Sequence, residues 1–325
     1  MDELFLGIDT SNYKTSAAVT DAGGSIIYQR SEYLEVPNGS RGLRQSECFF
    51  RHSNRLPDYI AAISRSVNMA DVRAVGVSSR PRRVEGSYMP CFLAGVNAAS
   101  EIASVLGIPV YEFSHQEGHA AAILDDTAAG PDRSILMHLS GGTTEILLCS
   151  PDSQGYDLEI TGGTRDISIG QLIDRAGVAM GYDFPSGMYL DELALSYIPS
   201  GKTGPGLPRI RITDGYFNLS GTETQAMRWI ESSDTTQYPY IAYSIFTRIA
   251  ELLVNSARSS ASAAGVSRVY MAGGVSASQF IRKHIRSIPD AADSFPEILF
   301  GDPALSGDNA VGIARLARKL FIQNS

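Results

Sequence analysis

Residues 4–19 read LFLGIDTSNYKTSAAV, in which two apolar segments flank a short polar turn. Short apolar segments that contain β-branched side chains and are bounded by polar turns are typical of strands. The pattern predicts a hairpin with one strand over 4–9 that ends in aspartate, a turn over 10–15 and a return strand over 16–20. A third strand is expected at 25–28. An Asp-Thr-Ser turn is also common without any ligand, so this hairpin alone leaves the function open.

A second hairpin is expected at residues 134–148, SILMHLSGGTTEILL, about 130 residues after the first. Its paired glycines let backbone N–H groups approach a phosphate without obstruction by a Cβ atom, although Gly-Gly is also a common hairpin turn. Two such hairpins indicate a duplicated, two-lobe nucleotide-binding protein, as in sugar kinases and actin-like ATPases. The candidate nucleotide contacts at this turn are His138, Leu139, Ser140, Gly141 and Gly142.

Strands alternate with helices along the rest of the chain, which predicts an α/β fold with largely parallel sheets and right-handed crossovers. Helices are expected over 46–69, 91–106, 169–180 and 239–265, and Pro57 is expected to open a new helix rather than lie inside one. A plain exposed loop is predicted over 200–215, with a tRNA contact as the alternative. We assign the lobes as 1–130 plus 304–325 (N-terminal) and 131–303 (C-terminal).

The composition is that of an ordinary globular protein. The chain has 325 residues, of which 43% are hydrophobic and 19% charged, and its formal net charge of −8 argues against an extensive nucleic-acid-binding surface. The basic clusters at 80–83 and 282–286 are interpreted as solvated faces, and a partner subunit could supply positive surface. The three cysteines lack a CxxC spacing, and we find neither a signal peptide nor a membrane span. We predict a cytoplasmic protein.

Two of the five histidines, His115 and His119, are four residues apart, so a helix would place both imidazoles on one face as a shared metal requires. Glu117 would point elsewhere, which excludes the arrangement of zinc proteases, where a glutamate base follows the first histidine. Two surface histidines are the alternative interpretation. A third ligand must come from elsewhere. Asp308, at a turn into the last helix, is the candidate third ligand. The alternative interpretation is that Asp308 is a helix N-cap.

One further turn has the chemistry of a nucleotide site. A buried strand at 269–272 enters Gly273-Gly274 at the start of a helix. Helix N-termini bind phosphate groups well, because their backbone N–H groups are unpaired and the helix dipole favours negative charge. This turn is therefore a candidate contact for adenosine or phosphate.

In sequence order these motifs resemble the family that makes threonylcarbamoyladenosine in tRNA, TsaD in bacteria, once described as an O-sialoglycoprotein endopeptidase. The most specific match is 115–119, which is similar to the family's H-x-E-G-H, with Asp308 in its terminal D-N-A segment. The other matches are Gly7 to Ser11 with G-I-E/D-T-S, Ser140 to Gly142 with S-G-G-H-T, Gly170 to Asp174 with G-E-A-F-D, Pro185 to Gly187 with P-G-G-P, Leu219 to Gly221 with S-F-S-G, and Gly273 to Ala277 with G-G-V-A-A-N.

The resemblance implies an actin-like ATPase (ASKHA) fold: two lobes of mixed sheets with crossover helices and a nucleotide and metal cleft between them. It implies one divalent metal, iron or zinc, on His115, His119 and Asp308, which would stabilise negative charge on phosphate or acyl oxygens. The implied donor is an adenine nucleotide, threonylcarbamoyl-adenylate, and the acceptor a tRNA adenosine beside the anticodon. The implied nucleotide contacts are Asp174 and Asp191 on ribose hydroxyls, Gly187, Gly273 and Gly274 along the adenosine, and Ser278 at the position of an adenosine-contacting Asn.

The chain also departs from the family pattern. The family's acidic pair in C-D-E/D-T is Tyr13-Lys14 here, which makes these two the candidate catalytic residues. By simple counting this changes the local charge by about three units. The remaining departures are Thr143 for His, Gln171 for Glu, Ser278 for Asn, Glu223 for Lys, and Arg80-Pro81-Arg82 for a G-P-G loop.

Three functions follow as hypotheses. The first is a metal-dependent acyl or carbamoyl transferase like the tRNA-modifying enzyme. The second is a diverged, non-catalytic or regulatory paralogue that binds nucleotide and metal. The third is a nucleotide phosphohydrolase or kinase on the same fold, for which Lys14 beside a phosphate hairpin would be suited. The predicted partners are tRNA, the other subunits of a threonylcarbamoyl-transfer complex, or a second chain in a homo- or heterodimer.

Overall fold

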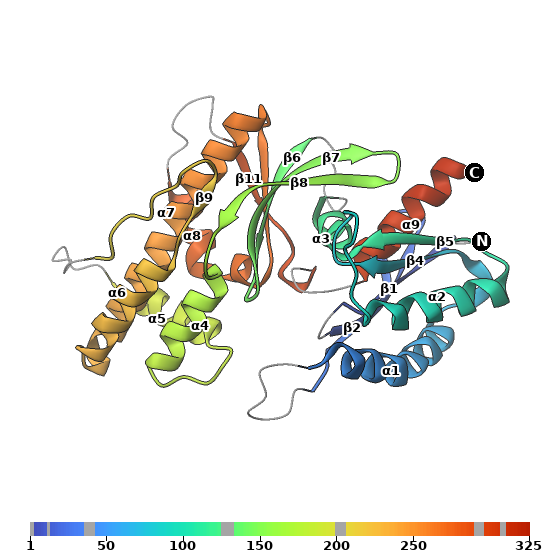
Figure 1. Cartoon of the computed structure of the whole chain (residues 1–325), viewed down its shortest axis with the longest axis horizontal. Coiled ribbons are helices and arrows are strands. Elements are labelled where there is room, and N and C mark those ends of the chain that lie inside the picture. Colours follow the sequence, from blue (N-terminus) through green and yellow to red (C-terminus); the bar gives the residue numbers. More distant parts are fainter. Residues whose placement is uncertain are drawn as a thin grey trace. The chain divides into compact units, whose positions relative to one another are not determined.

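A five-stranded mixed sheet forms the centre of the first structural unit (Figure 1). The computed structural model describes residues 3–11, 14–35, 43–124, 133–198, 206–288, 296–305 and 310–325. The strand order is β3-β2-β1-β4-β5, with β1 and β2 antiparallel, β2 and β3 antiparallel, and β4 and β5 continuing parallel to β1. The bounds are β1 (Leu4–Asp9), β2 (Lys14–Asp21), β3 (Ile26–Tyr33), β4 (Val72–Arg80) and β5 (Val110–Ser114).

Both faces of β1 are buried, and alternate side chains meet different helices. Leu4, Leu6 and Ile8 pack in one apolar cluster with helix α1 (Gln45–Ser66) and helix α2 (Phe92–Leu106). The other face of β1 meets helix α9 (Val311–Asn324), where Phe5 packs against Phe321. Because strand side chains alternate between faces, Asp9 belongs to the face that carries α9.

Glycines allow α9 to lie directly on the sheet and on helix α3 (His115–Leu124). A Cβ atom at Gly7 would lie 2.2 Å from the Ala310 carbonyl oxygen, and one at Gly76 would lie 2.6 Å from the carbonyl oxygen of Ile313. The tightest approach joins the two helices, where a Cβ atom at Gly312 would lie 1.8 Å from the oxygen of Gly118. No larger residue fits at these positions without displacement of backbone.

The expectation for Pro57 was wrong. Helix α1 is a continuous 22-residue helix with Pro57 inside it. A proline in a helix interior costs about 3 kcal/mol because it removes one backbone hydrogen bond and clashes with the preceding turn. Pro57 is exposed, whereas Leu56, Tyr59 and Ile63 are buried on the other side of the helix. Packing of this apolar face outweighs the cost of a proline inside the helix. Sequence periodicity alone does not show which of these two free-energy terms is larger.

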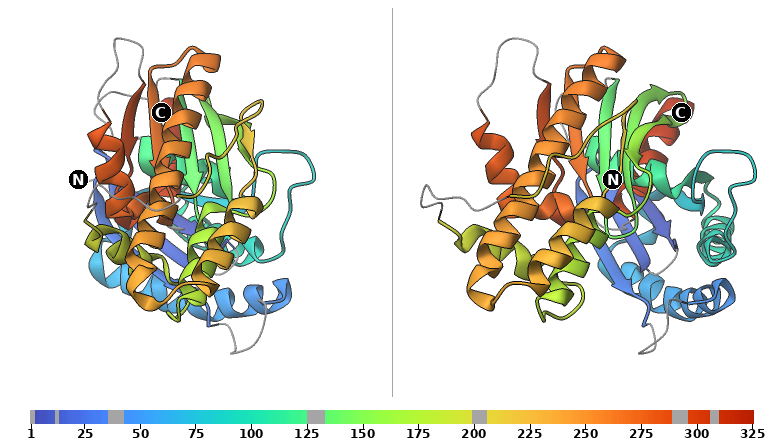
Figure 2. Two further views of the ribbon diagram at one scale, coloured as in Figure 1. Left: turned by 90° about the vertical axis from the view of Figure 1, so that its left-hand side faces the viewer. Right: turned by 60° about the vertical axis from the view of Figure 1, so that its left-hand side comes forward.

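The second unit is built on a six-stranded sheet with the order β11-β10-β6-β7-β8-β9. Its strands are β6 (Ser134–Leu139), β7 (Thr144–Asp152), β8 (Gly155–Thr164), β9 (Tyr216–Phe217), β10 (Arg268–Ala272) and β11 (Glu297–Phe300). Its helices are α4 (Ile169–Ala179), α5 (Gly187–Ser196), α6 (Ser220–Glu231), α7 (Tyr238–Ala264) and α8 (Gln279–Ser287). The long helix α7 runs alongside this sheet and contacts β6 and β10 (Figure 2). Short 3-10 turns occur at Met69–Asp71, Thr235–Gln237, Gly274–Ala277 and Pro303–Leu305.

The two sheets share one topology. The order β3-β2-β1-β4-β5 in the first unit corresponds to β8-β7-β6-β10-β11 in the second, with β9 as an added edge strand. In each sheet the first strand forms an antiparallel hairpin with the next one and pairs in parallel with a strand that comes later in the chain. The duplicated hairpins expected from the sequence therefore open two copies of the same α/β arrangement.

Each unit is built from more than one segment of the chain. The first unit comprises Met1–Asp132, Ser150–Leu158 and Gly307–Ser325, and the second comprises Arg133–Cys149 and Glu159–Ser306. The tip of the β7–β8 hairpin thus belongs to the first unit. There the Arg83 guanidinium donates to the Asp152 carboxylate and to the Gln154 side-chain oxygen, each at 2.7 Å. The lobe assignment at residues 130 and 303 stays a prediction.

Across the described ranges, no helix combines the length and apolar character that a membrane span requires.

We expect Gly312→Ala to lower the free energy of unfolding by about 1–3 kcal/mol, because the added Cβ collides with backbone rather than with a flexible side chain. Chemical denaturation followed by circular dichroism measures this change. Gly221→Ala in α6 is the matched control, because its Cβ meets nothing within 4 Å. The control should be neutral or slightly more stable than wild type. Equal stability of Gly312→Ala and wild type would contradict the close approach of α9 and α3.

Candidate functional site

Helix α3 begins with a capping box that fixes the position of the two histidines. The Ser114 N–H and hydroxyl both donate to Glu117 Oε2, at 2.8 and 2.7 Å, and the Glu117 N–H donates to Ser114 Oγ at 3.2 Å. This reciprocal bonding satisfies backbone groups that a helix start leaves unpaired. Glu117 is only 2% exposed and serves this cap. The Ser-x-x-Glu spacing is the sequence signal for it, and the sequence reasoning missed it.

His115 and His119 project from the first turns of α3 with their Nε2 atoms 2.9 Å apart. Two imidazole nitrogens this close share either a proton or a cation, since two facing lone pairs repel each other. Nitrogens bound to one metal at about 2.1 Å lie about 3.0–3.4 Å apart for bond angles of 90° to 109°. The observed separation is near that range. The pair predicted from the i, i+4 spacing is therefore brought together.

The Asp9 carboxylate contacts His115 at Nδ1, the ring nitrogen that does not face His119. Asp9 Oδ2 lies 2.8 Å from His115 Nδ1, and Asp9 Oδ1 accepts from the Ser11 N–H at 2.8 Å and from the Ser78 hydroxyl at 2.6 Å. Asp9 is 1% exposed. The carboxyl ends of parallel strands β1, β4 and β5 meet at one edge of the sheet, which explains why Asp9, Ser78 and the start of α3 are neighbours. Sequence reasoning did not include Asp9 in the site.

His115 and His119 supply two imidazole nitrogens of the kind that bind a divalent metal. A metal-bound histidine commonly donates its second ring nitrogen to a carboxylate, as His115 can do to Asp9. Imidazole nitrogen suits both iron and zinc. Within the described ranges no group of three or more His, Cys, Asp or Glu side chains forms a complete metal site. The third ligand expected from the sequence, Asp308, lies outside the described residues.

Of the two candidate catalytic residues, Lys14 is described and Tyr13 lies outside the described residues. Lys14 is the first residue of β2, and its Nζ atom lies 5.1 Å from the centre of the Tyr33 ring. Asp9 pairs with Ser16 across the hairpin, and Lys14 is two residues from Ser16. Residues two apart on a strand share a face. Lys14 therefore lies on the same face and at the same end of the sheet as Asp9.

In the second unit, the turn after β6 is closed by the side chain of Ser140 and carries a glycine that faces open space. Ser140 Oγ accepts from the N–H groups of Gly142 and Thr143 at 3.2 and 3.0 Å. A Cβ atom at Gly141 would meet nothing within 4 Å, and the same holds at Gly274. His138 and Leu139 end β6 beside this turn. Both glycines therefore face open space, and contact of this turn with a phosphate or adenosine stays a prediction.

Two other glycines at this end of the sheet are required by packing. Gly170 abuts the turn, because a Cβ atom there would lie 2.6 Å from the Ser140 carbonyl oxygen. Gly273 has φ +92° and its Cβ would lie 2.3 Å from the Leu139 carbonyl oxygen. The backbone around the β6 turn is therefore held from two sides.

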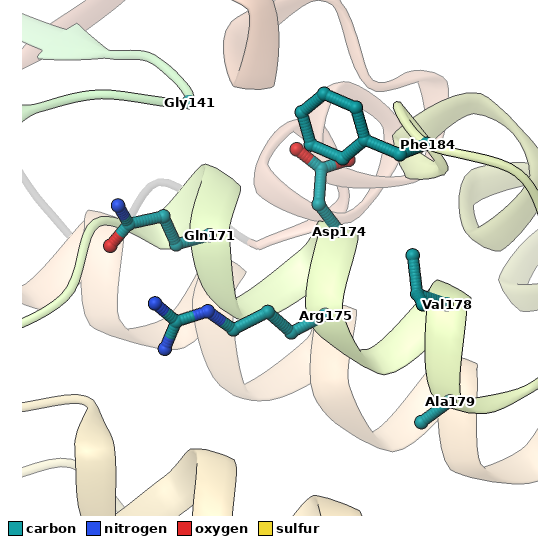
Figure 3. Close-up of a pocket in the computed structure, with 7 residues that line it drawn as sticks. All are labelled: Gly141, Gln171, Asp174, Arg175, Val178, Ala179 and Phe184. Carbon is teal, nitrogen blue, oxygen red and sulfur yellow. The ribbon is translucent and has the colours of Figure 1, made fainter. Parts of the chain in front are cut away.

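A surface pocket of about 530 Å³ lies along α4. Figure 3 shows Gln171, Asp174 and Arg175 projecting from this helix. The pocket is lined by Gly141, Gln171, Asp174, Arg175, Val178, Ala179 and Phe184. Burial raises the pKa of the Asp174 carboxyl group above its ordinary value, although the N–H groups of Ser186 and Gly187 donate to it. Arg175 forms an ion pair with Glu223 at 2.8 Å. The pocket thus combines an apolar lining with a carboxylate and a guanidinium.

Asp191 and Ser278 lie together at the start of α8. The Ser278 hydroxyl donates to the Asp191 carboxylate, which also accepts from the Gln279 N–H at 2.9 Å and the Phe280 N–H at 3.1 Å. Both carboxylate oxygens therefore cap the helix. Gly187 begins α5 close to Asp174. Contact of Asp174, Asp191 or Ser278 with a nucleotide stays a prediction.

Sequence reasoning also missed Asp166, which joins the loop after β8 to the start of α6. Its carboxylate accepts from the backbone N–H groups of Ile167 and Leu219 at 2.8 Å and of Ser220 at 3.0 Å. Burial raises its pKa, but these hydrogen bonds outweigh that effect and lower the pKa to about 2.

Asp166→Asn should therefore lower the free energy of unfolding at pH 7 and leave a smaller difference from wild type at pH 2. The unfolded-state pKa is about 3.9, so the contribution of the carboxylate is complete above that pH and is lost as pH falls through the folded-state pKa. Urea denaturation between pH 2 and 7 measures the difference. A constant difference across this range would show that the ionised carboxylate is not the stabilising species.

The duplicated sheet and its glycine turns define a protein of the actin-like ATPase fold. The structure is similar to HypF from T. kodakarensis, with TM-score 0.61, 13% identity and coverage of 99% of this chain and 48% of that one. It is also similar to the activator of 2-hydroxyisocaproyl-CoA dehydratase from Clostridium difficile with bound ADPNP, with TM-score 0.53, 16% identity and coverage of 100% and 97%. Likeness at such identities shows the fold, and it confirms the predicted fold class.

The sequence comparisons give the family. A model of the TsaD family, tRNA N6-adenosine threonylcarbamoyltransferase, matches residues 40–315. The enzyme of that name from Salinibacter ruber is 28% identical over 337 residues, covering 98% of this chain and 94% of its own. The Listeria welshimeri enzyme is 29% identical over 332 residues, with coverage of 98% and 92%. The chain belongs to the TsaD family, as its motifs predicted, and the general function of that family is threonylcarbamoyl transfer to tRNA.

Proposed function

We propose that this protein transfers the threonylcarbamoyl group from threonylcarbamoyl-adenylate to a tRNA adenosine beside the anticodon, with a divalent metal at His115 and His119. The observation that carries the proposal is the convergence of the two Nε2 atoms at 2.9 Å, with His115 held by the buried Asp9. Family membership supplies the reaction class. A metal bound there would provide positive charge against the negative charge that develops on acyl and phosphate oxygens.

In the proposed reaction the adenine N6 forms a bond to the carbamoyl carbon while the bond from that carbon to the adenylate phosphate oxygen breaks. AMP leaves with the electron pair of that bond, and N6 loses one proton to water. Lys14 lies on the Asp9 face of the sheet, where its ammonium group would stabilise a negatively charged oxygen. The N–H groups at Gly141 and Gly274 would support the phosphate or ribose of the donor.

A non-catalytic nucleotide-binding role is the second candidate, and one observation favours it. Lys14 stands where the family pattern has an acidic residue, and both carboxylate oxygens of Asp191 accept hydrogen bonds at the start of α8. A protein with this site could retain metal and nucleotide without transferring the acyl group. The two candidate functions differ in one measurable product: the transferase forms threonylcarbamoyladenosine, and the non-catalytic protein does not.

Purified protein supplied with threonylcarbamoyl-adenylate and an unmodified tRNA transcript should form threonylcarbamoyladenosine, measured by mass spectrometry of digested nucleosides. Lys14→Ala should reduce the rate by about tenfold or more, the usual effect of removing one charged group that stabilises a transition state. Lys14→Arg should retain part of the activity. Lys283→Ala, an exposed lysine on α8, is the matched control. Formation of no product by wild-type protein would favour the non-catalytic role.

The metal assignment is tested separately. Wild-type protein loaded with Zn²⁺ or Fe²⁺ and desalted should retain about one equivalent, whereas His115→Ala and His119→Ala should each retain little, because each removes one ligand. Elemental analysis measures the content. His284→Ala is the control, since that imidazole stacks on Phe280 in the second unit. Full metal content in both α3 variants would rule out this site.

A further inference from the structure

Asp9 has hydrogen-bond partners on both of its carboxylate oxygens. Its Oδ1 atom is fixed by the Ser11 N–H and the Ser78 hydroxyl, so the carboxylate cannot rotate freely. Its Oδ2 atom points to His115 Nδ1 at 2.8 Å. The ring of Phe92 packs edge-on against His115 with centres 6.4 Å apart. The orientation of the imidazole is therefore set from two sides.

The chemistry of a carboxylate determines where the His115 proton sits. An ionised Asp9 carboxylate only accepts hydrogen bonds, and opposite such a carboxylate His115 Nδ1 would be the donor in this contact. In the neutral imidazole the other nitrogen then carries the lone pair. That nitrogen, Nε2, is the atom that lies 2.9 Å from His119.

We propose that Asp9 is a positioning residue that holds His115 as the Nδ1–H tautomer and so keeps the Nε2 lone pair directed at the point shared with His119. Its functional meaning rests on the metal site proposed above. Ser78 contributes to this positioning, because its hydroxyl donates to Asp9 Oδ1 at 2.6 Å and so holds the carboxylate that orients the His115 ring.

Asp9→Asn tests this tautomer with almost no change in shape. The amide oxygen can keep the bonds to Ser11 and Ser78, which places the amide NH₂ group opposite His115 Nδ1. An NH₂ group only donates, so Nδ1 would have to accept and the ring proton would move to Nε2. The proton would then occupy the direction that a metal needs.

The experiment uses the full chain labelled with ¹⁵N-histidine at pH 8, and long-range ¹H–¹⁵N correlations identify which ring nitrogen carries the proton. The His115→Gln variant assigns the signal. We expect Nδ1–H in wild type and Ser78→Ala, and Nε2–H in Asp9→Asn. Asp21→Asn is the matched control, because Asp21 also caps a turn in this sheet by accepting from two backbone N–H groups.

Zn²⁺ affinity, measured by competition with a chelator, gives a second readout. Loss of a group that orients a metal ligand typically weakens affinity by about 10–100-fold, so we expect that change in Asp9→Asn, a smaller one in Ser78→Ala and none in Asp21→Asn. Circular dichroism shows whether each variant is folded.

Nε2–H in wild-type His115 would overturn the proposal, even if Asp9→Asn does not fold. Unchanged affinity in a folded Asp9→Asn variant would do the same. Absence of metal binding by wild type together with an Nδ1–H ring would refute the proposed metal site and support the tautomer assignment.

Discussion

The close contact of α9 with β1, β4 and α3 is the constraint on which the first unit depends. Four glycines permit it. A Cβ atom at Gly7, Gly76 or Gly312 would collide with backbone, and one at Gly118 would lie 2.8 Å from the side chain of Ile313 in α9. Gly118 lies between the two histidines of the candidate site. The same residue that lets α9 pack on α3 therefore lies within the motif that presents the two imidazoles. Packing and the candidate site therefore share one short segment.

Parallel strands account for the assembly of the site. Strands β1, β4 and β5 end at one edge of the sheet, so Asp9, Ser78 and His115 meet although the chain separates them widely. The carboxyl ends of such strands are the usual ligand-binding edge of α/β proteins. At the corresponding edge of the second unit, β6 and β10 end at the Gly141 and Gly273 turns. The duplicated topology thus places one such edge in each unit.

Local patterns in the sequence predicted most strands and helices and the convergence of His115 and His119, because these depend on the period of a strand or a helix. Pro57 was misplaced because tertiary packing of α1 decides that helix. Asp9, Asp166 and the capping role of Asp191 were missed because their partners are distant in sequence, and only the fold brings them together. Tyr13 and Asp308 lie outside the described residues, so their predicted roles stay predictions.

The hairpin formed by β7 and β8 has a consequence for dissection of the protein. Its tip, Ser150–Leu158, belongs to the first unit, where Arg83 binds Asp152 and Gln154, while its base belongs to the second. The last helix likewise returns to the first unit. A fragment that stops at residue 132 would therefore lack two of the three segments of its own unit. Neither half of this chain is a continuous stretch that a single pair of cloning boundaries can isolate.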